Sequence, residues 1–523
     1  LLATPAAAGT LETLTLPAPS SPGGGLWFSD VQDRFPDVDW STLDRLYLPA
    51  GEWSNLLLGN LPMRSPDRPL VITNQGGQVR IGRFGGNSHP ILIFGGSNWR
   101  LTGHYDPVAQ TGHENFPGHA GGYANSRGRY GIFVDDAFET AGSSGISVAG
   151  RATDFEIDFV EITRANFAGV LMKTDDQGDA DMSNVRFHDN YVHDIGSEGL
   201  YFGSTQSPPQ HKFPGLKIYN NRIVRTGTEI AQFGQVGRGS EIYNNVFVMG
   251  ALTWKKPFQN FQDNAGQLGV RQGTTSIHHN IFIGGAASFF QLFPQPRDGD
   301  SHAAGDQVII HDNYFSHSRN FGAYLHAQSD GVTEYILRDN WLREVRFEYD
   351  ELDPDANNRN AMFITFNSQS QITFEGNRWT GPQTLVASGG GANITETGSV
   401  NLPSIDPVRF MDSGFPADFD YLKVESWTDF DKNGQPVTYR VGDYAVTLER
   451  ENGGDLYRCL VANTGQPPAT SPSFWQPVPP PADDYRLHPG SPFQGFGLLD
   501  DAGTVLFDDF ESGGTEAWSS TVP

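Results

Sequence analysis

The sequence of 523 residues contains a single cysteine, Cys459. One thiol excludes an internal disulfide framework and any zinc site built from several cysteines. No apolar run approaches the ~20 residues that a membrane-spanning helix needs, so we expect no membrane insertion. Basic residues are also few, 35 Lys and Arg against 61 Asp and Glu, for a net charge of −26. This balance argues against a nucleic-acid partner, because phosphate binding needs a basic face.

Long amphipathic helical patterns are missing as well. Glycine (61 residues), proline (34) and aromatic residues (12%) are plentiful instead, which is typical of β structure with many turns. A chain of this length is too long for one ordinary core unless the fold grows by stacking repeats.

Short apolar strands recur along the middle of the chain. Residues 131–136, 169–176, 199–205 and 230–235 each combine an apolar strand with a glycine and polar residues. We interpret them as one strand on successive coils. We expect four later segments to continue the series, namely residues 260–264, 288–293, 323–328 and 362–366.

A column of asparagines supports the same phase, since each of its members follows one apolar strand and precedes another. Their irregular spacing indicates a fixed coil with insertions at its corners. Stacked at one corner, their amides can hydrogen-bond along the stack. The sequence therefore predicts an all-β, right-handed parallel β-helix rather than a leucine-rich or propeller array. The column comprises Asn190, Asn221, Asn245, Asn280, Asn313, Asn340 and Asn377.

Composition divides the chain into five parts. We expect a flexible segment over residues 1–25, the β-helix over 26–420, and a small β-rich module over 421–480. Residues 481–500 are predicted to return as a final β-helix strand, and 501–523 form an acidic tail.

Lysine is rare in this chain, and Lys173 alone falls within a strand of the principal column. Alternation places Val170 and Met172 inside and Lys173 outside, and the same count on the next coil turns Tyr201 outward. Gln232 follows on the coil after that. Because parallel strands lie about 4.8 Å apart, we expect these side chains to face one ligand.

The surrounding phrases AGVLMKTD, HDNYVHDIGSEGLYFG and IYNN resemble a phrase of secreted bacterial β-helix proteins of the pectate-lyase-like superfamily. The opening LYLPAGEW…RPLVITNQGGQV is similar to the first coils of secreted β-helix polysaccharide lyases. The resemblance implies a carbohydrate-active protein located outside the cell or in the periplasm. The catalytic motifs of pectate lyases and chondroitinase B are not reproduced. The matching positions are Lys173, Thr174, Asp175, His188, Asn190, His193, Glu198 and Tyr201.

Acidic residues gather beside the predicted strand ends. Asp135, Asp136 and Asp176 are candidate Ca²⁺ ligands, because calcium takes several hard oxygens. Asp175 and Glu198 are candidates for acid/base chemistry, whose geometry depends on their separation. Tight turns also favour aspartate, so a purely structural role stays open.

Residues 427–478 resemble the small chitin- and cellulose-binding modules. The resemblance implies that Tyr457 and Trp475 lie against sugar rings. The same two aromatics could instead form the core of a very small domain.

These patterns predict a monomeric enzyme that acts on a polysaccharide. The first hypothesis is a lyase that cleaves a uronic-acid glycan by β-elimination, with His193 sharing proton transfer with the lysine and tyrosine. Gln232, Arg238 and Gln262 would bind the glycan. A glycoside hydrolase, a C5-epimerase and a non-catalytic binding solenoid stay open as alternatives.

Overall fold

The computed structural model describes most of the chain. It covers residues 11–19, 24–28, 34–82, 88–103, 127, 130–173, 181–203, 211–258, 262–270, 273–286, 288–294, 306–326, 334–346, 361–366, 371–388, 393–416, 418–448 and 454–499. No helix in these ranges is long and apolar enough to cross a membrane.

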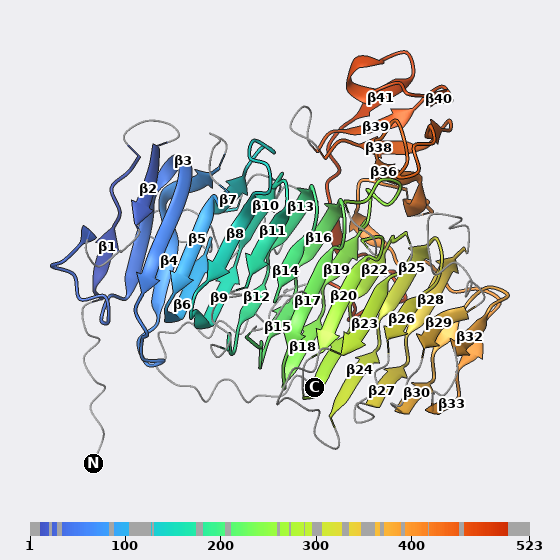
Figure 1. Cartoon of the computed structure of the whole chain (residues 1–523), viewed down its shortest axis with the longest axis horizontal. Helices are drawn as coiled ribbons and strands as arrows, with labels where there is room; N and C mark the ends of the chain where they lie inside the picture. The colour runs from blue at the N-terminus through green and yellow to red at the C-terminus, as the bar shows by residue number, and fades with distance from the viewer. Residues whose placement is uncertain are drawn as a thin grey trace.

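Strands β1 to β34 form one continuous parallel sheet that winds into a solenoid with three faces (Figure 1). The fold is a parallel β-helix, as predicted. Its first coils come from β1 (Thr13–Thr15), β2 (Gly24–Phe28), β3 (Arg45–Leu61) and β4 (Leu70–Ile81). The long β3 turns through all three faces, and β1 pairs with it in parallel register, so the solenoid begins within the segment predicted to be flexible.

Face 1 carries one strand from each later coil. It consists of β6 (Ser97–Thr102), β9 (Thr153–Asp158), β12 (Arg186–His188), β15 (Lys217–Tyr219), β18 (Ser240–Tyr243), β21 (Thr275–His278), β24 (Gln307–His311), β27 (Glu334–Arg338), β30 (Gln371–Glu375) and β33 (Asn393–Thr397).

Face 2 follows face 1 around each coil. It consists of β7 (Ile132–Asp135), β10 (Val160–Thr163), β13 (Tyr191–Ile195), β16 (Arg222–Thr226), β19 (Val246–Val248), β22 (Ile281–Ile283), β25 (Tyr314–Ser318), β28 (Trp341–Val345), β31 (Arg378–Trp379) and β34 (Val400–Asn401).

Face 3 completes the coil and carries the predicted column. It consists of β5 (Ile91–Gly95), β8 (Ser144–Ala149), β11 (Ala168–Met172), β14 (Leu200–Phe202), β17 (Ala231–Val236), β20 (Gly266–Val270), β23 (Phe290–Pro294), β26 (Ala323–His326), β29 (Ala361–Phe366) and β32 (Thr384–Ser388).

Two predicted strands were assigned wrongly. Strand β7 pairs with β10 on face 2, so the segment 131–136 does not belong to the column of β11, β14 and β17. The next strand of that column is β20, which begins at Gly266, two residues after the end of the predicted segment 260–264. Both errors arise because every apolar strand of a solenoid has a similar pattern, whichever face it occupies.

Apolar side chains from all three faces fill the inside of the solenoid. Phe247, Phe282 and Phe315 stack there on successive coils, with ring centroids 4.7 and 5.1 Å apart. Burial of such rings provides the main favourable free energy of a fold whose coils contact only their neighbours.

The predicted asparagine ladder is confirmed. The main-chain N–H of each asparagine donates to the Oδ1 atom of the next, at 3.0 to 3.1 Å, from Asn190 to Asn377. Each side-chain amide except the last also donates to its neighbour's Oδ1. All seven side chains are buried, so the ladder satisfies polar groups that water does not reach.

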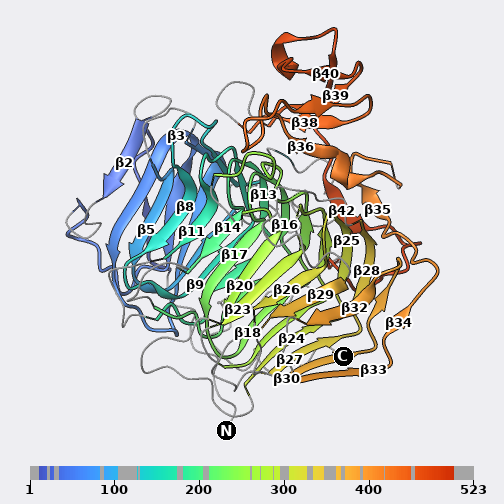
Figure 2. The same cartoon turned by 45° about the vertical axis from the view of Figure 1, so that its right-hand side comes forward.

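Residues after the last coil return along the outside of face 2. Strand β35 (Phe410–Asp412) pairs antiparallel with β42 (Asp484–Leu487), and this pair lies next to β25 (Figure 2). Tyr485 and Phe493 pack there with outward side chains of face 2 such as Tyr314. The prediction of a final β-helix strand over 481–500 is therefore wrong, because this segment covers face 2 without extending the coil.

The small β-rich module interrupts this return. Its main sheet has four strands, and a second pair lies beside it. The elements are β36 (Val424–Ser426), β38 (Tyr444–Val446), β39 (Leu456–Cys459) and β41 (Trp475–Val478), the pair β37 (Thr438–Tyr439) and β40 (Asn463–Thr464), and the 3₁₀ turns η3 (Tyr421–Lys423) and η4 (Pro468–Thr470).

Candidate active site

Polar side chains follow the outer surface of face 3. Leu171 pairs with Tyr201, which pairs with Gln232, and the same register continues to Gln267 and Gln291. Inside the same strands, Leu200 and Phe202 belong to the apolar core, as alternation requires. The strands thus present one row of hydrogen-bonding groups along the solenoid axis.

Lys173 lies at the end of β11, two residues beyond Leu171 and therefore on the same side of the strand. Its Nζ atom lies 5.0 Å from the centre of the Tyr201 ring. The rings of Phe167 and Tyr201 also contact each other edge-to-face, with their centroids 5.9 Å apart. The predicted juxtaposition of Lys173 and Tyr201 is confirmed, although they are not in direct register.

Two glutamates precede this row on adjacent coils. Leu200 pairs with Ala231, so Glu198 and Glu229 occupy equivalent positions one coil apart. The Gly199 N–H donates to the Glu229 carbonyl at 3.0 Å. A side chain at Gly199 would lie 2.4 Å from the Ile230 carbonyl oxygen, so only glycine permits this approach. The close packing holds both glutamates next to the Lys173–Tyr201 contact.

Each of these two carboxyl groups has one oxygen with a partner and one without. Glu198 Oε1 accepts a hydrogen bond from Gln262 Nε2 at 3.4 Å, and Glu229 Oε1 accepts one from Gln267 Nε2. Their Oε2 atoms are buried and have no hydrogen-bond partner among the described residues. Glu198 is 2% exposed and Glu229 is fully enclosed. Buried polar atoms of this kind are rare in native proteins and call for an explanation.

Burial raises the pKa of both carboxyl groups, because it disfavours the charged form. The neighbouring charge of Glu198 raises the pKa of Glu229 further, well above its usual range. Lys173 acts in the opposite direction on Glu198 and lowers its pKa. Of the two carboxyl groups, Glu229 is therefore the one whose surroundings more strongly favour the proton, and such a difference between neighbouring acids is what acid/base chemistry needs.

Amide side chains complete the wall beside the pair. Asn264 Nδ2 donates to Gln291 Oε1 at 3.2 Å, and Ser288 Oγ donates to Asn264 Oδ1 at 2.5 Å. Gln232 is buried in the same row. Gln232 thus lies where the sequence placed it, whereas Gln262 precedes β20 and its predicted position in the column is taken by Gln267. The predicted role of Gln232 and Gln262 in glycan binding stays a prediction.

His193 does not belong to this site. It lies on β13 of face 2, where Nε2 contacts Glu161 Oε1 at 3.1 Å and Nδ1 contacts Asp194 Oδ2 at 2.7 Å. Arg225 binds the other oxygen of Asp194 at 2.5 Å and also Asp483, which comes from the C-terminal return. His193 is 1% exposed. Its predicted place beside Lys173 and Tyr201 is wrong, because one step around the coil separates face 2 from face 3.

The predicted metal ligands do not form a calcium site in the described residues. Both Asp135 oxygens bind the Arg164 guanidinium, on face 2. Asp136 accepts hydrogen bonds from Ser143 and Thr140, and burial raises its pKa to about 6. A cation held by Asp135 would have to displace an arginine, so these residues do not fit Ca²⁺. Asp175 and Asp176 lie outside the described residues.

One other group of described residues has metal-like spacing. Glu156, Asp158 and His188 have ligand atoms within 4.8 Å of one another. Arg100 already binds both carboxylates, with Nε 2.9 Å from Glu156. Burial opposes the charged imidazole, but hydrogen bonds that it donates to Asp189 and Glu156 raise the pKa of His188 to about 10. The group is therefore an ion-pair network in which a guanidinium occupies the place of a metal.

The remaining predicted binding residues are corrected as follows. Tyr457 and Trp475 are 6% and 1% exposed and belong to the core of the module. The indole Nε1 of Trp475 donates to the Gln466 carbonyl at 2.8 Å. These rings are unavailable to a sugar because a domain so small needs them inside. Arg238 lies beyond the end of β17 and pairs with Asp306 at 3.6 Å.

Glu229 was missed by the sequence analysis, although a signal was present. Glu198-Gly-Leu-Tyr-Phe202 and Glu229-Ile-Ala-Gln-Phe233 share a glutamate four residues before an inward phenylalanine. Aligning the coils on this phenylalanine would have placed the two carboxyl groups side by side.

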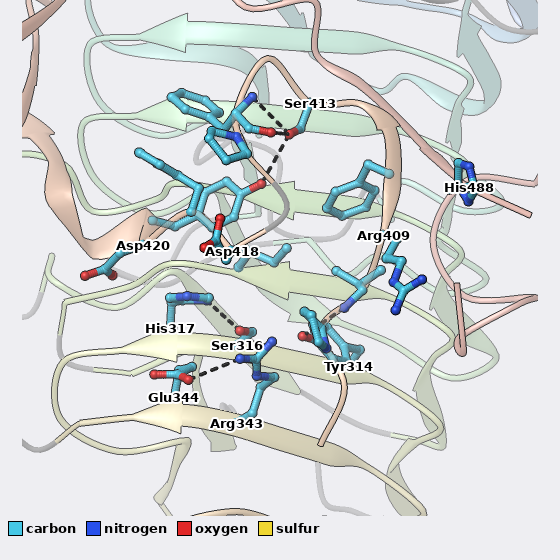
Figure 3. A pocket seen from close by; sticks show the side chains of 18 of the residues that line it. Tyr314, Ser316, His317, Arg343, Glu344, Arg409, Ser413, Asp418, Asp420 and His488 are labelled. Carbon is cyan, nitrogen blue, oxygen red and sulfur yellow. Dashed lines mark hydrogen bonds and ion pairs between the residues drawn. The ribbon is translucent and has the colours of Figure 1, made fainter. Parts of the chain in front are cut away.

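A cavity of about 510 Å³ lies on the opposite side of the solenoid, between face 2 and the return segment (Figure 3). Its charged residues satisfy one another. Arg343 contacts Glu344 at 3.1 Å, and Arg346 contacts Asp420 at 2.8 Å. Burial lowers the pKa of His317 to about 4, so that imidazole is neutral. The second of these pairs joins Arg346, just after β28, to the return segment, whereas Arg343 and Glu344 are neighbours within β28. In having such ion pairs the cavity differs from the region of Glu198 and Glu229.

No family model and no curated protein sequence matches the chain. Among solved structures, the chain is similar to the A-module of the mannuronan C-5 epimerase AlgE6 of Azotobacter vinelandii. The identity is 12%, the match covers 69% of this chain and 91% of that chain, and the TM-score is 0.22. The AlgE4 A-module of the same organism matches at 13% identity over 67% and 91%, again with a TM-score of 0.22. Superposition this loose does not bear on function, which has to be inferred from the side chains of face 3.

Proposed function

We propose that this protein is a polysaccharide-degrading enzyme whose active site lies on face 3, with Glu198 and Glu229 as its acid/base pair. The observation that carries the proposal is the stacking of these two buried carboxyl groups on adjacent coils, each with one oxygen lacking a partner in the described structure. Burying two such groups costs free energy that one amide donor each offsets only in part. A glycan bound here could accept a proton from one carboxyl group while the other carboxylate activates a water molecule. Both groups would then have a catalytic role.

The favoured reaction is hydrolysis of a glycosidic bond. Glu229, whose pKa is raised by burial and by Glu198, would protonate the departing sugar oxygen. Glu198, whose pKa is raised by burial while Lys173 acts to lower it, would act in its ionised form on the other side of the bond as base or nucleophile. The amides of Gln232 and Gln267 would bind sugar hydroxyls along the row. Hydrolysis is preferred over the lyase hypothesis because His193 is withdrawn to face 2.

The contact between Lys173 and Tyr201 supports β-elimination as the second candidate. A lysine 5.0 Å from a tyrosine ring could neutralise a uronate carboxylate while the phenol takes part in proton transfer. A C5-epimerase would share this first step. In either reaction the two glutamates would form hydrogen bonds with the substrate, and Glu229 would not protonate a leaving group.

The test is a panel of neutral and uronic-acid polysaccharides incubated with the purified protein. Reducing ends that appear without ultraviolet absorbance indicate hydrolysis, and new absorbance from unsaturated ends indicates elimination. Binding without either product would show a non-catalytic solenoid and would contradict the proposal.

A further inference from the structure

A cleft of about 660 Å³ separates the solenoid from the module. On the solenoid side it is lined by Phe167, Ser197 and Thr228, which lie at the corners that lead into face 3. Phe258 closes it on the loop between β19 and β20, and Trp427 faces it from the module, which projects from the solenoid in Figure 1. Parts of the chain more than 200 residues apart therefore build one concave surface.

The module is fixed at this cleft by direct contacts. The Ser426 N–H donates to the Leu252 carbonyl at 2.8 Å, and the Lys432 N–H donates to the Lys255 carbonyl at 2.8 Å. Lys255 Nζ also contacts Glu425 Oε1 at 2.6 Å, in a half-buried pair. The first two bonds join backbone to backbone, so the width of the cleft is set by the fold and not by a linker.

The cleft borders the candidate active site, because two residues of its lining directly precede the two glutamates. Ser197 precedes Glu198 directly, and its hydroxyl lies 3.1 Å from that of Thr228, which precedes Glu229. Phe167, which lines the cleft, contacts the ring of Tyr201. A chain-like ligand placed across the two glutamates would therefore pass from the row of face 3 into this cleft.

Its lining suits a sugar chain. The Phe258 side chain is 89% exposed, so its ring is open to a ligand. The Trp427 indole N–H is buried without an acceptor in the described residues. A pyranose can lay its apolar C–H face on the first ring and offer a hydroxyl oxygen to the second. Lys256 adds an exposed ammonium that can donate to further hydroxyls.

We propose that this cleft is a second binding region of the enzyme, which holds the sugar units of a polysaccharide next to those at Glu198 and Glu229. The inference rests on the proposed function and deepens it, since it assigns a long glycan chain as the substrate. The module then acts as a wall of the substrate cleft, although its own aromatic core is closed to ligands.

Phe258→Ala tests the proposal, because an exposed side chain can be removed without opening the core. The matched control is Val441→Ala, whose side chain is 66% exposed on the module outside the cleft lining. Both variants and the wild type are assayed on a ladder of oligosaccharides of a cleaved glycan. Phe258→Ala should raise KM for long chains about tenfold, with a smaller rise for the shortest substrate and an unchanged kcat. The control should match the wild type at every length.

The outcomes separate this inference from the function on which it rests. Cleavage by the wild type with no difference between the two variants at any length overturns the cleft and leaves the active site standing. Retention of glycan on an affinity gel without cleavage, weakened by Phe258→Ala, removes the hydrolysis and keeps the cleft. Neither cleavage nor retention for any polysaccharide of the panel overturns both.

Discussion

Faces 2 and 3 of the solenoid both bury acidic groups, only one step apart on the same coil, yet the partners of these groups differ between the two faces. On face 2, Asp194 lies between His193 and Arg225, and Arg225 also binds Asp483. Burial alone would raise the pKa of Asp194, but Arg225 and Arg127 hold it well below its usual range. On face 3, Glu198 and Glu229 receive one amide donor each, and burial leaves their pKa values raised.

The difference teaches that burial of a charged group does not by itself indicate function. The arginine-paired carboxylates of face 2 hold distant segments together, and their oxygens already have partners. A pair of acids with unsatisfied oxygens costs stability, and such cost is typical of sites kept for chemistry. Face 2 is therefore interpreted as structural and face 3 as catalytic.

The largest expected effect is the loss of activity in Glu229→Gln. The amide keeps the shape of the side chain but cannot donate a catalytic proton, so turnover should fall on the order of 10²–10⁴-fold. Stability should be unchanged or slightly higher, because one buried acid is removed. Release of reducing ends and a denaturant melt measure the two quantities. Full activity in this variant would remove Glu229 from the mechanism.

Glu161→Gln is the matched control on face 2. Glu161 is fully buried and accepts from His193 Nε2, so its substitution disturbs a paired network. We expect lower stability with unchanged activity per folded molecule. A loss of turnover as large as that of Glu229→Gln would erase the distinction between the two faces.

Asp483→Ala should have the next largest effect, and on stability alone. It leaves the Arg225 guanidinium buried with part of its charge unpaired, which costs about 3–5 kcal/mol. Denaturant unfolding of the variant and the wild type measures this cost as a difference in the free energy of unfolding. A difference below about 1 kcal/mol would show that the network is not needed for folding.

Lys173→Met probes the electrostatics of face 3. Lys173 lowers the pKa of Glu198, so its removal should raise that pKa. The acidic limb of the pH–rate profile, which requires ionised Glu198, should then move to higher pH. Loss of all activity at every pH would instead favour elimination, in which the ammonium contacts the substrate.

The smallest effect concerns His188 on face 1, a third environment with full pairing. Its folded pKa of about 10 lies above the unfolded value of about 6.5, so its charge stabilises the fold at low pH. This contribution is complete below about pH 6.5 and is lost as pH rises toward 10. Thermal melts of wild type should therefore decline across that range more than those of His188→Gln. Parallel curves would show that the imidazole is not charged in the fold.

Much of the fold could be predicted from short-range pattern. The asparagine column and the alternation in β11 and β14 are local features, and they placed Lys173 and Tyr201 together correctly. The surroundings of His193 were not predictable in the same way, because its partner Glu161 lies one coil earlier, and Arg225, which binds its other partner Asp194, also binds Asp483 of the return segment. Long-range pairing decides whether a polar side chain is free, and spacing along the strand does not reveal it.

The reach of Asp483 has a consequence for how the molecule is made. Its carboxylate binds Arg225, and its carbonyl accepts from the Arg222 guanidinium at 2.6 Å, more than 250 residues upstream. Coils can wind up one after another as the polypeptide emerges, but these two arginines lack their shared partner until residue 483 arrives. The return segment thus closes the flank of the solenoid after the coils have formed, and a protein shortened before residue 483 would keep its spiral while leaving that flank open.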